Sequence, residues 1–180
     1  MALDPLVIAE TVLAVEIGGV VVVPDSAVAA GGAVTIFLLI VLSAFFSSSE
    51  IAMFSLPAHR VDALLNDGVP GARTLDHLKS DPHRLLVTIL VGNNLVNIAM
   101  SSIATGLLAM YLTQGEAVLA ATFGITALVL LFGESAPKSY AVENTESWAL
   151  TISRPLQFAE RVLLPLVVLF DYLTRLVTKV

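Results

Sequence analysis

The sequence predicts an all-α membrane protein, with three transmembrane helices, cytoplasmic juxtamembrane helices and an amphipathic C-terminal helix. Hydrophobic residues make up 57% of the 180 residues and charged residues 13%, whereas soluble domains have about half and a quarter. Three stretches are apolar over the roughly 17–25 residues that a membrane crossing needs. The basic residues gather in two regions that three crossings would place on one side of the membrane.

The three transmembrane spans are expected at about residues 33–56, 85–112 and 117–133. Each contains few or no charged residues. Residues 113–116, which join the second and third spans, contain no basic residue and have turn chemistry, as an outer hairpin should.

Charge placement predicts the orientation of a multi-pass protein in the plasma membrane. Residues 1–32 contain four acidic residues and no Lys or Arg, and all nine basic residues lie between 60 and 84 or between 138 and 179. Basic loops stay in the cytoplasm. We therefore expect residues 1–32 to form an extracytoplasmic N-terminal segment, residues 33–180 the transmembrane domain, and the C-terminus to be cytoplasmic.

Two segments are expected beside the membrane rather than across it. Residues 57–82 mix acidic and basic residues around a Gly- and Pro-rich break, which predicts two short juxtamembrane helices. Residues 140–178 are apolar but interrupted by charges and prolines, which favours an amphipathic helix in the inner interface. A fourth span is the alternative, and it would have to bury those charges.

Composition and residue type exclude several functions. The chain has no cysteine, so disulfides and thiolate metal sites are absent, and a net charge of −6 without a basic stripe argues against nucleic acid. All three histidines lie in or beside the cytoplasmic segment, so the spans offer no nucleophile–base arrangement. We therefore expect no enzymatic activity.

The first polar patch lies in the first span. Ser43 and Ser47 are four residues apart and Glu50 follows three later, so the three share one helical face. A single serine in a membrane helix usually bonds the carbonyl four residues back or permits close packing. Four serines and a carboxylate in eight residues favour a functional site instead, with Ser48 and Glu50 as secondary or pathway residues.

The second polar patch contains three asparagines in five residues. Asn93 and Asn97 are four residues apart and present two amide oxygens on one face, with Asn94 as a secondary candidate. Asparagine can also join helices, at about 0.6 kcal/mol for each hydrogen bond. Three such residues exceed that need and indicate a ligand or pathway role.

The third polar patch lies at the inner end of the third span. Pro137 displaces the carbonyl four residues back, which leaves the Gly133 oxygen free beside the Glu134 carboxylate. Ser135 is a secondary candidate. The alternative for Glu134 is a salt bridge with Lys138, four residues later.

Depth and ligand type together predict a cation site. With 1.5 Å per residue, Ser47, Asn93 and Glu134 lie about 9, 12 and 5 Å from the inner edge of the membrane core, so the patches converge in its inner half. Their donors are hydroxyl, amide, backbone and carboxylate oxygens, which suit Mg²⁺, Ca²⁺, Mn²⁺ or Na⁺. Few carboxylates imply modest affinity and easy release.

Three stretches, LSAFFSSSEIAMFSL, DPHRLLVTILVGNNLVNIA and FGESAPKSYA, resemble the signature stretches of the CNNM/CorC magnesium transporters over about residues 33–178. The resemblance implies a homodimeric transmembrane domain in the lipid bilayer, with a belt helix at 140–178. It implies a cytosolic CBS-pair module in the full-length protein. The Mg²⁺ site that it implies consists of Ser43, Ser47, Asn93, Asn97, Gly133 and Glu134.

The expected function is Mg²⁺ transport, most simply export from the cytosol, because the patches lie near the inner face. Export against an inward gradient would need a coupling ion, for which Na⁺ is suited. The alternative is a Mg²⁺-sensing membrane protein that carries no ion and regulates another channel or transporter.

Overall fold

The computed structural model describes residues 15–17, 20–22 and 25–178, and almost all of them are helical. Three helical stretches are long and apolar enough to cross a membrane: α2 (Asp25–Ser55), α5 (Pro82–Leu108) and the continuous stretch Gln114–Glu143. The last consists of α6 (Gln114–Leu128), the π-helical segment η1 (Val129–Ser135) and α7 (Ala136–Glu143). The predicted all-α membrane class is confirmed.

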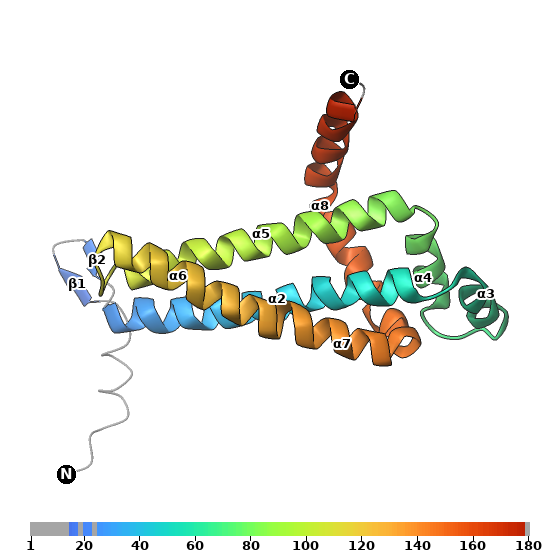
Figure 1. The fold of residues 1–180 in the computed structure, drawn as a ribbon, viewed down its shortest axis with the longest axis horizontal. Helices are drawn as coiled ribbons and strands as arrows, with labels where there is room; N and C mark the ends of the chain where they lie inside the picture. The colour runs from blue at the N-terminus through green and yellow to red at the C-terminus, as the bar shows by residue number, and fades with distance from the viewer. Residues whose placement is uncertain (1–14, 18–19, 23–24, 179–180) are drawn as a thin grey trace, which may run out of the picture.

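Helix α2 packs against every other long helix. It contacts α5 on one side, η1 and α7 on another, and α8 (Thr145–Thr178) where that helix crosses the bundle. Figure 1 shows that α2 and the stretch from α6 to α7 run in the same direction along the bundle. Helix α5, which comes between them in the sequence, runs in the opposite direction. These contacts enclose one face of the second half of α2. The buried residues of α2 all lie there, and they are Ser43, Phe46, Ser47, Ser48, Ser49, Ala52 and Met53.

Helix α2 begins at Asp25 rather than near residue 33, so residues 25–32 of the expected N-terminal segment are helical. Asp25 lies in the first turn, where a negative charge complements the helix dipole. Ahead of it, β1 (Val15–Ile17) pairs antiparallel with β2 (Val20–Val22). The rest of the expected extracytoplasmic segment lies outside the described residues.

The two expected juxtamembrane helices are α3 (Ala58–Asn66) and α4 (Ala72–Lys79). Between them Gly68 and Gly71 have φ angles of 68° and 94°, a left-handed conformation that favours glycine. Figure 1 shows both helices at the same end of the bundle, beyond the end of α2.

A lysine from α4 closes the end of α2. Pro57 has no N–H group, so the Met53 carbonyl four residues earlier has no helical donor. The Lys79 ammonium donates hydrogen bonds to the carbonyl oxygens of Met53, at 2.5 Å, and Leu56, at 2.6 Å. Partial burial lowers the pKa of Lys79. This contact fixes the hairpin of α3 and α4 to the C-terminal end of α2.

Helix α5 begins at residue 82, as its sequence indicates. The Asp81 carboxylate accepts a hydrogen bond from the Arg84 N–H at 3.1 Å, and Pro82 occupies the first turn, where a missing N–H costs nothing. Helix α5 ends at Leu108, before the expected end of the second span at 112.

The third helical stretch continues beyond Gly133, the expected end of the third span. The helix continues through η1 into α7 and ends at Glu143. In η1 the hydrogen bonds are wider, and the Ala136 N–H donates to the Leu131 carbonyl, five residues back. Pro137 lacks an N–H, so the regular ladder is interrupted there, and the π segment ends just before it.

Helix α8 crosses the bundle instead of running along it, and its C-terminal part projects sideways in Figure 1. It packs against α2, α4 and α5, and Glu160 forms an ion pair with Arg84 of α5 at 2.5 Å. Among the described residues α8 is not one of the helices apolar enough to span. This arrangement favours the interfacial helix over a fourth span, and the helix begins at Thr145 rather than at 140 because residues 140–143 belong to α7.

Candidate cation site

Ser43 lies at the centre of the polar cluster. Its side chain is fully buried, and its hydroxyl faces the amide oxygens of Asn93 at 3.1 Å and Asn97 at 3.0 Å. The two amides share one face of α5 because they are four residues apart. A hydroxyl has a single hydrogen and can donate it to only one of them at a time. Three oxygen atoms from α2 and α5 thus converge. The one hydroxyl hydrogen lies between two amide oxygens, each of which could accept it.

Gly133 of η1 lies against the same serine. A β-carbon added to Gly133 would stand 2.9 Å from the Ser43 hydroxyl oxygen and 3.3 Å from the Ser43 Cβ. The third transmembrane stretch therefore approaches α2 this closely only because residue 133 has no side chain. Residues from all three polar patches, Ser43, Asn93 with Asn97, and Gly133, therefore lie together at Ser43 in the structure.

Glu134 opens onto a cleft of about 290 Å³ that Asn97 also lines. The cleft lies between α5, α6 and η1, and its other polar lining residues are Ser101, Thr122 and Thr126. Our sequence analysis missed these three hydroxyls, although the four-residue spacing of the two threonines could have indicated a polar stripe on α6. The carboxylate and one amide of the cluster thus share a polar opening.

Ser47 lies one helical turn beyond Ser43 and is only 1% exposed. Its hydroxyl has no hydrogen-bond partner among the described residues. The hydroxyl of Thr88 in α5 is also fully buried and also has no hydrogen-bond partner among the described residues. The sequence patterns did not point to this residue. A buried hydroxyl without a partner costs about 1–3 kcal/mol, so these two hydroxyls favour a ligand or water role.

Three of the secondary candidates face other groups. Ser48 donates to the Phe45 carbonyl at 3.1 Å, which is the back-bonding alternative for serine in a helix. Asn94 is exposed and lines a different, mostly apolar cleft that includes residues of α8. Ser135 is exposed, and its carbonyl accepts a hydrogen bond from Ser139 at 3.0 Å.

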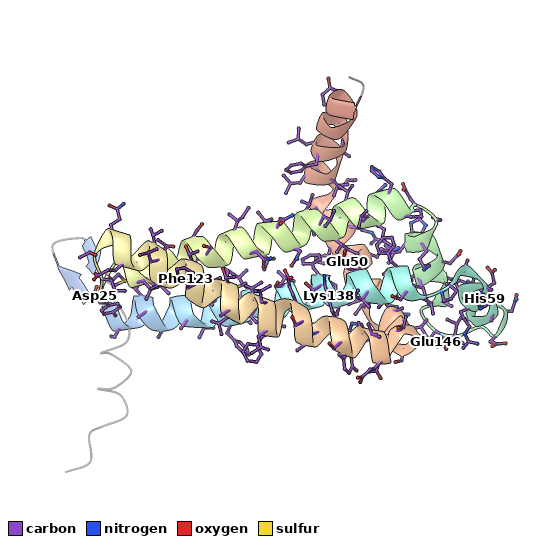
Figure 2. The ribbon with its side chains drawn as sticks, in the orientation of Figure 1. Asp25, Glu50, His59, Phe123, Lys138 and Glu146 are labelled. Atoms are coloured by element: carbon purple, nitrogen blue, oxygen red, sulfur yellow. The ribbon has the colours of Figure 1, made fainter. Side chains whose placement is uncertain are left out.

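Glu50, the fourth secondary candidate, forms an ion pair with Lys138 of α7 at 3.1 Å. Figure 2 labels both residues, and they lie close together where α2 and α7 run side by side. Among the ion pairs of the described residues, Lys138 is thus held by Glu50 and not by Glu134, the partner that the helical spacing alone suggested.

The donor set fits a hard cation held with modest affinity. Within the described residues there is no group of three or more His, Cys, Asp or Glu side chains close enough to hold a metal ion. The converging atoms are instead neutral hydroxyl and amide oxygens, with the Glu134 carboxylate nearby. Oxygen-only ligands suit Mg²⁺, Ca²⁺ or Mn²⁺, and the low count of charged ligands favours weak, reversible binding.

Comparison with known proteins shows the family of this chain. Residues 34–180 match the family model described as the cyclin M (CNNM) transmembrane N-terminal domain. The chain belongs to the CNNM family. The three helical crossings, the juxtamembrane hairpin and α8 all lie almost entirely inside the matched residues.

Relatives of this CNNM domain occur in bacteria and plants. It is 34% identical over 135 residues to the UPF0053 inner membrane protein YfjD of Escherichia coli, covering 75% of this chain and 31% of that protein. It is 36% identical over 131 residues to a UPF0053 protein of Haemophilus influenzae, covering 73% and 31%. A chloroplastic DUF21 domain-containing protein of Arabidopsis thaliana is 34% identical over 137 residues, covering 76% and 20%. The chain thus spans about a third or less of these relatives.

Proposed function

We propose that this CNNM domain transports Mg²⁺ across the membrane through the cluster centred on Ser43. The observation that carries the proposal is the convergence of the Ser43 hydroxyl with the Asn93 and Asn97 amide oxygens at 3.0–3.1 Å, inside membrane-crossing helices. Membrane proteins of this family are broadly linked to divalent-cation transport. Helix packing alone does not require an intramembrane polar cluster of this size, because a few serines would be enough for it.

Each residue of the cluster has a role that follows from its chemistry. When a cation binds, the Ser43 hydrogen turns away, so that its oxygen and both amide oxygens present lone pairs. Glu134 supplies negative charge from the adjacent cleft, and Gly133 allows η1 close enough to α2 for its backbone to contribute. Mg²⁺ gives up water reluctantly and commonly keeps several water ligands, which the cleft beside Asn97 has room to hold.

The proposal includes the orientation of the protein, the direction of transport, its location and its partners. We place residue 25 on the outer side and the juxtamembrane hairpin in the cytoplasm, because the hairpin carries basic residues and the N-terminal region carries none. The plasma membrane is the proposed location, with Mg²⁺ leaving the cytosol and Na⁺ as the coupling ion. We further propose that the domain acts as a homodimer and that the full-length protein carries a cytosolic CBS-pair module.

A flux assay tests transport directly. Purified protein is reconstituted into liposomes that contain a Mg²⁺-sensitive dye, and Mg²⁺ is added with or without a Na⁺ gradient. The proposal predicts dye signal above that of protein-free liposomes, loss of that signal in Asn93→Ala, and retention in Asn94→Ala, whose side chain faces another cleft. Binding without flux under every gradient would replace transport by the sensing function.

A further inference from the structure

The ion pair between Glu50 and Lys138 lies at the inner end of the polar cluster. Glu50 follows Ser47 by three residues on α2, and Lys138 follows Glu134 by four residues across the end of η1. The side chains of Glu50 and Lys138 are about one-third exposed, at 33% and 37%, so the pair stands at the edge of the buried cluster. The unpartnered Ser47 hydroxyl lies between this pair and Ser43 along α2.

Lys138 can reach two carboxylates. Its ammonium is 3.1 Å from the Glu50 carboxylate, and its position four residues after Glu134 also places it within reach of that side chain. Glu134 in turn lines the polar cleft with Asn97. Lys138 is therefore paired with Glu50 in this structure, and a second carboxylate, Glu134, lies one helical turn away beside the candidate cation site.

We propose that Lys138 is a built-in competitor for the transported cation, and that Glu50 is the carboxylate that receives the cation at the cytoplasmic mouth. The inference rests on the proposed function. Before the cation binds, the Lys138 ammonium neutralises one of the two carboxylates. The bundle therefore does not carry two unpaired negative charges beside the cluster. As the cation approaches Glu50, it takes the place of the ammonium and then moves past Ser47 toward Ser43.

The charges determine the sign of each effect. Glu50, Glu134 and Lys138 together carry a net charge of about −1. Removing the lysine charge makes the mouth more negative and should tighten the binding of a dication, whereas removing the Glu50 charge should weaken it. At partly exposed positions a change of one charge near a dication alters affinity on the order of tenfold.

A purely structural role of the Glu50–Lys138 ion pair would give a different pattern of cation affinities. If the pair only fastened α2 to α7, Glu50→Gln and Lys138→Gln would each break the same contact and would change cation affinity in the same direction. Opposite signs for the two variants are therefore specific to competition. The double variant restores the net charge of −1 and should return affinity close to that of the parent.

The test is Mg²⁺ titration of thermal stability, because a ligand that binds the folded state raises its stability with concentration. Four proteins are compared: the parent, Glu50→Gln, Lys138→Gln and the double variant. We expect about tenfold weaker apparent affinity for Glu50→Gln, about tenfold tighter for Lys138→Gln, and near-parent affinity for the double variant.

A second ion pair provides matched controls. Arg60 of α3 and Glu146 of α8 are joined at 2.5 Å, and Figure 2 shows Glu146 near the cytoplasmic hairpin, apart from Glu50 and Lys138. Glu146→Gln and Arg60→Gln make the same changes of charge away from the cluster. Both should titrate like the parent, which excludes a general effect of net charge.

Each outcome has a separate meaning. Changes of the same sign in Glu50→Gln and Lys138→Gln, or parent-like affinity in both, would overturn the competition while leaving Mg²⁺ binding by the parent intact. Absence of any Mg²⁺ response in the parent would instead reject the proposed function together with this inference. Melting temperatures without Mg²⁺ show whether a variant folds, and the double variant tests the charge balance if a single variant is unstable.

Discussion

Gly133 lies so close to Ser43 that a β-carbon at position 133 would stand 2.9 Å from the serine hydroxyl oxygen. The missing side chain brings the π-helical segment η1 against α2 at the serine that faces Asn93 and Asn97. The close approach of η1 to α2 and the convergence of polar atoms therefore occur at one place, and the approach depends on the small size of residue 133.

Gly133→Ala should disturb the cluster. The added methyl group forces the Ser43 hydroxyl away from at least one amide oxygen, and overpacking typically costs about 1–3 kcal/mol of stability. We expect a lower melting temperature without Mg²⁺ and at least tenfold weaker stabilisation by Mg²⁺. Gly106→Ala is the control, because no atom lies within 4 Å of its added β-carbon, and alanine is the better helix former. Equal Mg²⁺ responses in the two variants would contradict the close-approach argument.

Ser43→Ala and Ser48→Ala should separate the two kinds of buried serine. Ser43 faces the two amide oxygens, whereas Ser48 donates to the Phe45 carbonyl within its own helix. We expect Ser43→Ala to lose at least tenfold in apparent Mg²⁺ affinity, about 1.4 kcal/mol, and Ser48→Ala to respond like the parent. Isothermal titration calorimetry measures both. A large loss in Ser48→Ala would show that back-bonded serines also belong to the site.

Much of the fold could be predicted from local sequence patterns. Hydropathy predicted three apolar stretches long enough to cross a membrane, because such signals act within one or two helical turns. Helical spacing placed Asn93 and Asn97 on one face, and depth arithmetic placed Asn93 in the same half of the membrane as Ser47 and Glu134. These patterns did not state which faces of the helices meet, and the structure brings the two amides to Ser43.

Contacts between distant segments could not be predicted in the same way. Lys79 reaches the end of α2, and Lys138 chooses Glu50 over Glu134, because of how whole helices pack, which no local pattern states. No local pattern predicted the π-helical segment η1, through which the helix continues beyond Gly133 into α7 despite Pro137.

Lys79→Met should loosen the juxtamembrane hairpin. The variant keeps the length of the side chain but removes the donor to the carbonyl oxygens of Met53 and Leu56, and hydrogen bonds to charged groups are worth about 1.5–3 kcal/mol. We expect a loss of that order in thermal or denaturant unfolding. Arg73→Met, at an exposed position of the same helix, should change stability by less than about 0.5 kcal/mol. Equal effects would mean that Lys79 does not cap α2.

The proposed orientation can be tested because the chain has no cysteine of its own. Gln114→Cys places an exposed thiol at the start of α6, and Asp67→Cys places one between α3 and α4. In intact cells a membrane-impermeant maleimide should label the first variant and not the second, and both should react after the cells are opened. The reverse labelling pattern would invert the orientation and with it the proposed direction of transport.

The most direct test of the central claim is to locate a bound cation. Mn²⁺ shares the preference of Mg²⁺ for oxygen ligands and gives an anomalous X-ray signal, so crystals of the protein grown with Mn²⁺ report the site. We predict an anomalous peak within bonding distance of the Ser43 hydroxyl and of the Asn93 and Asn97 amide oxygens. A Mn²⁺ peak elsewhere in the bundle, with none at Ser43, would contradict the account.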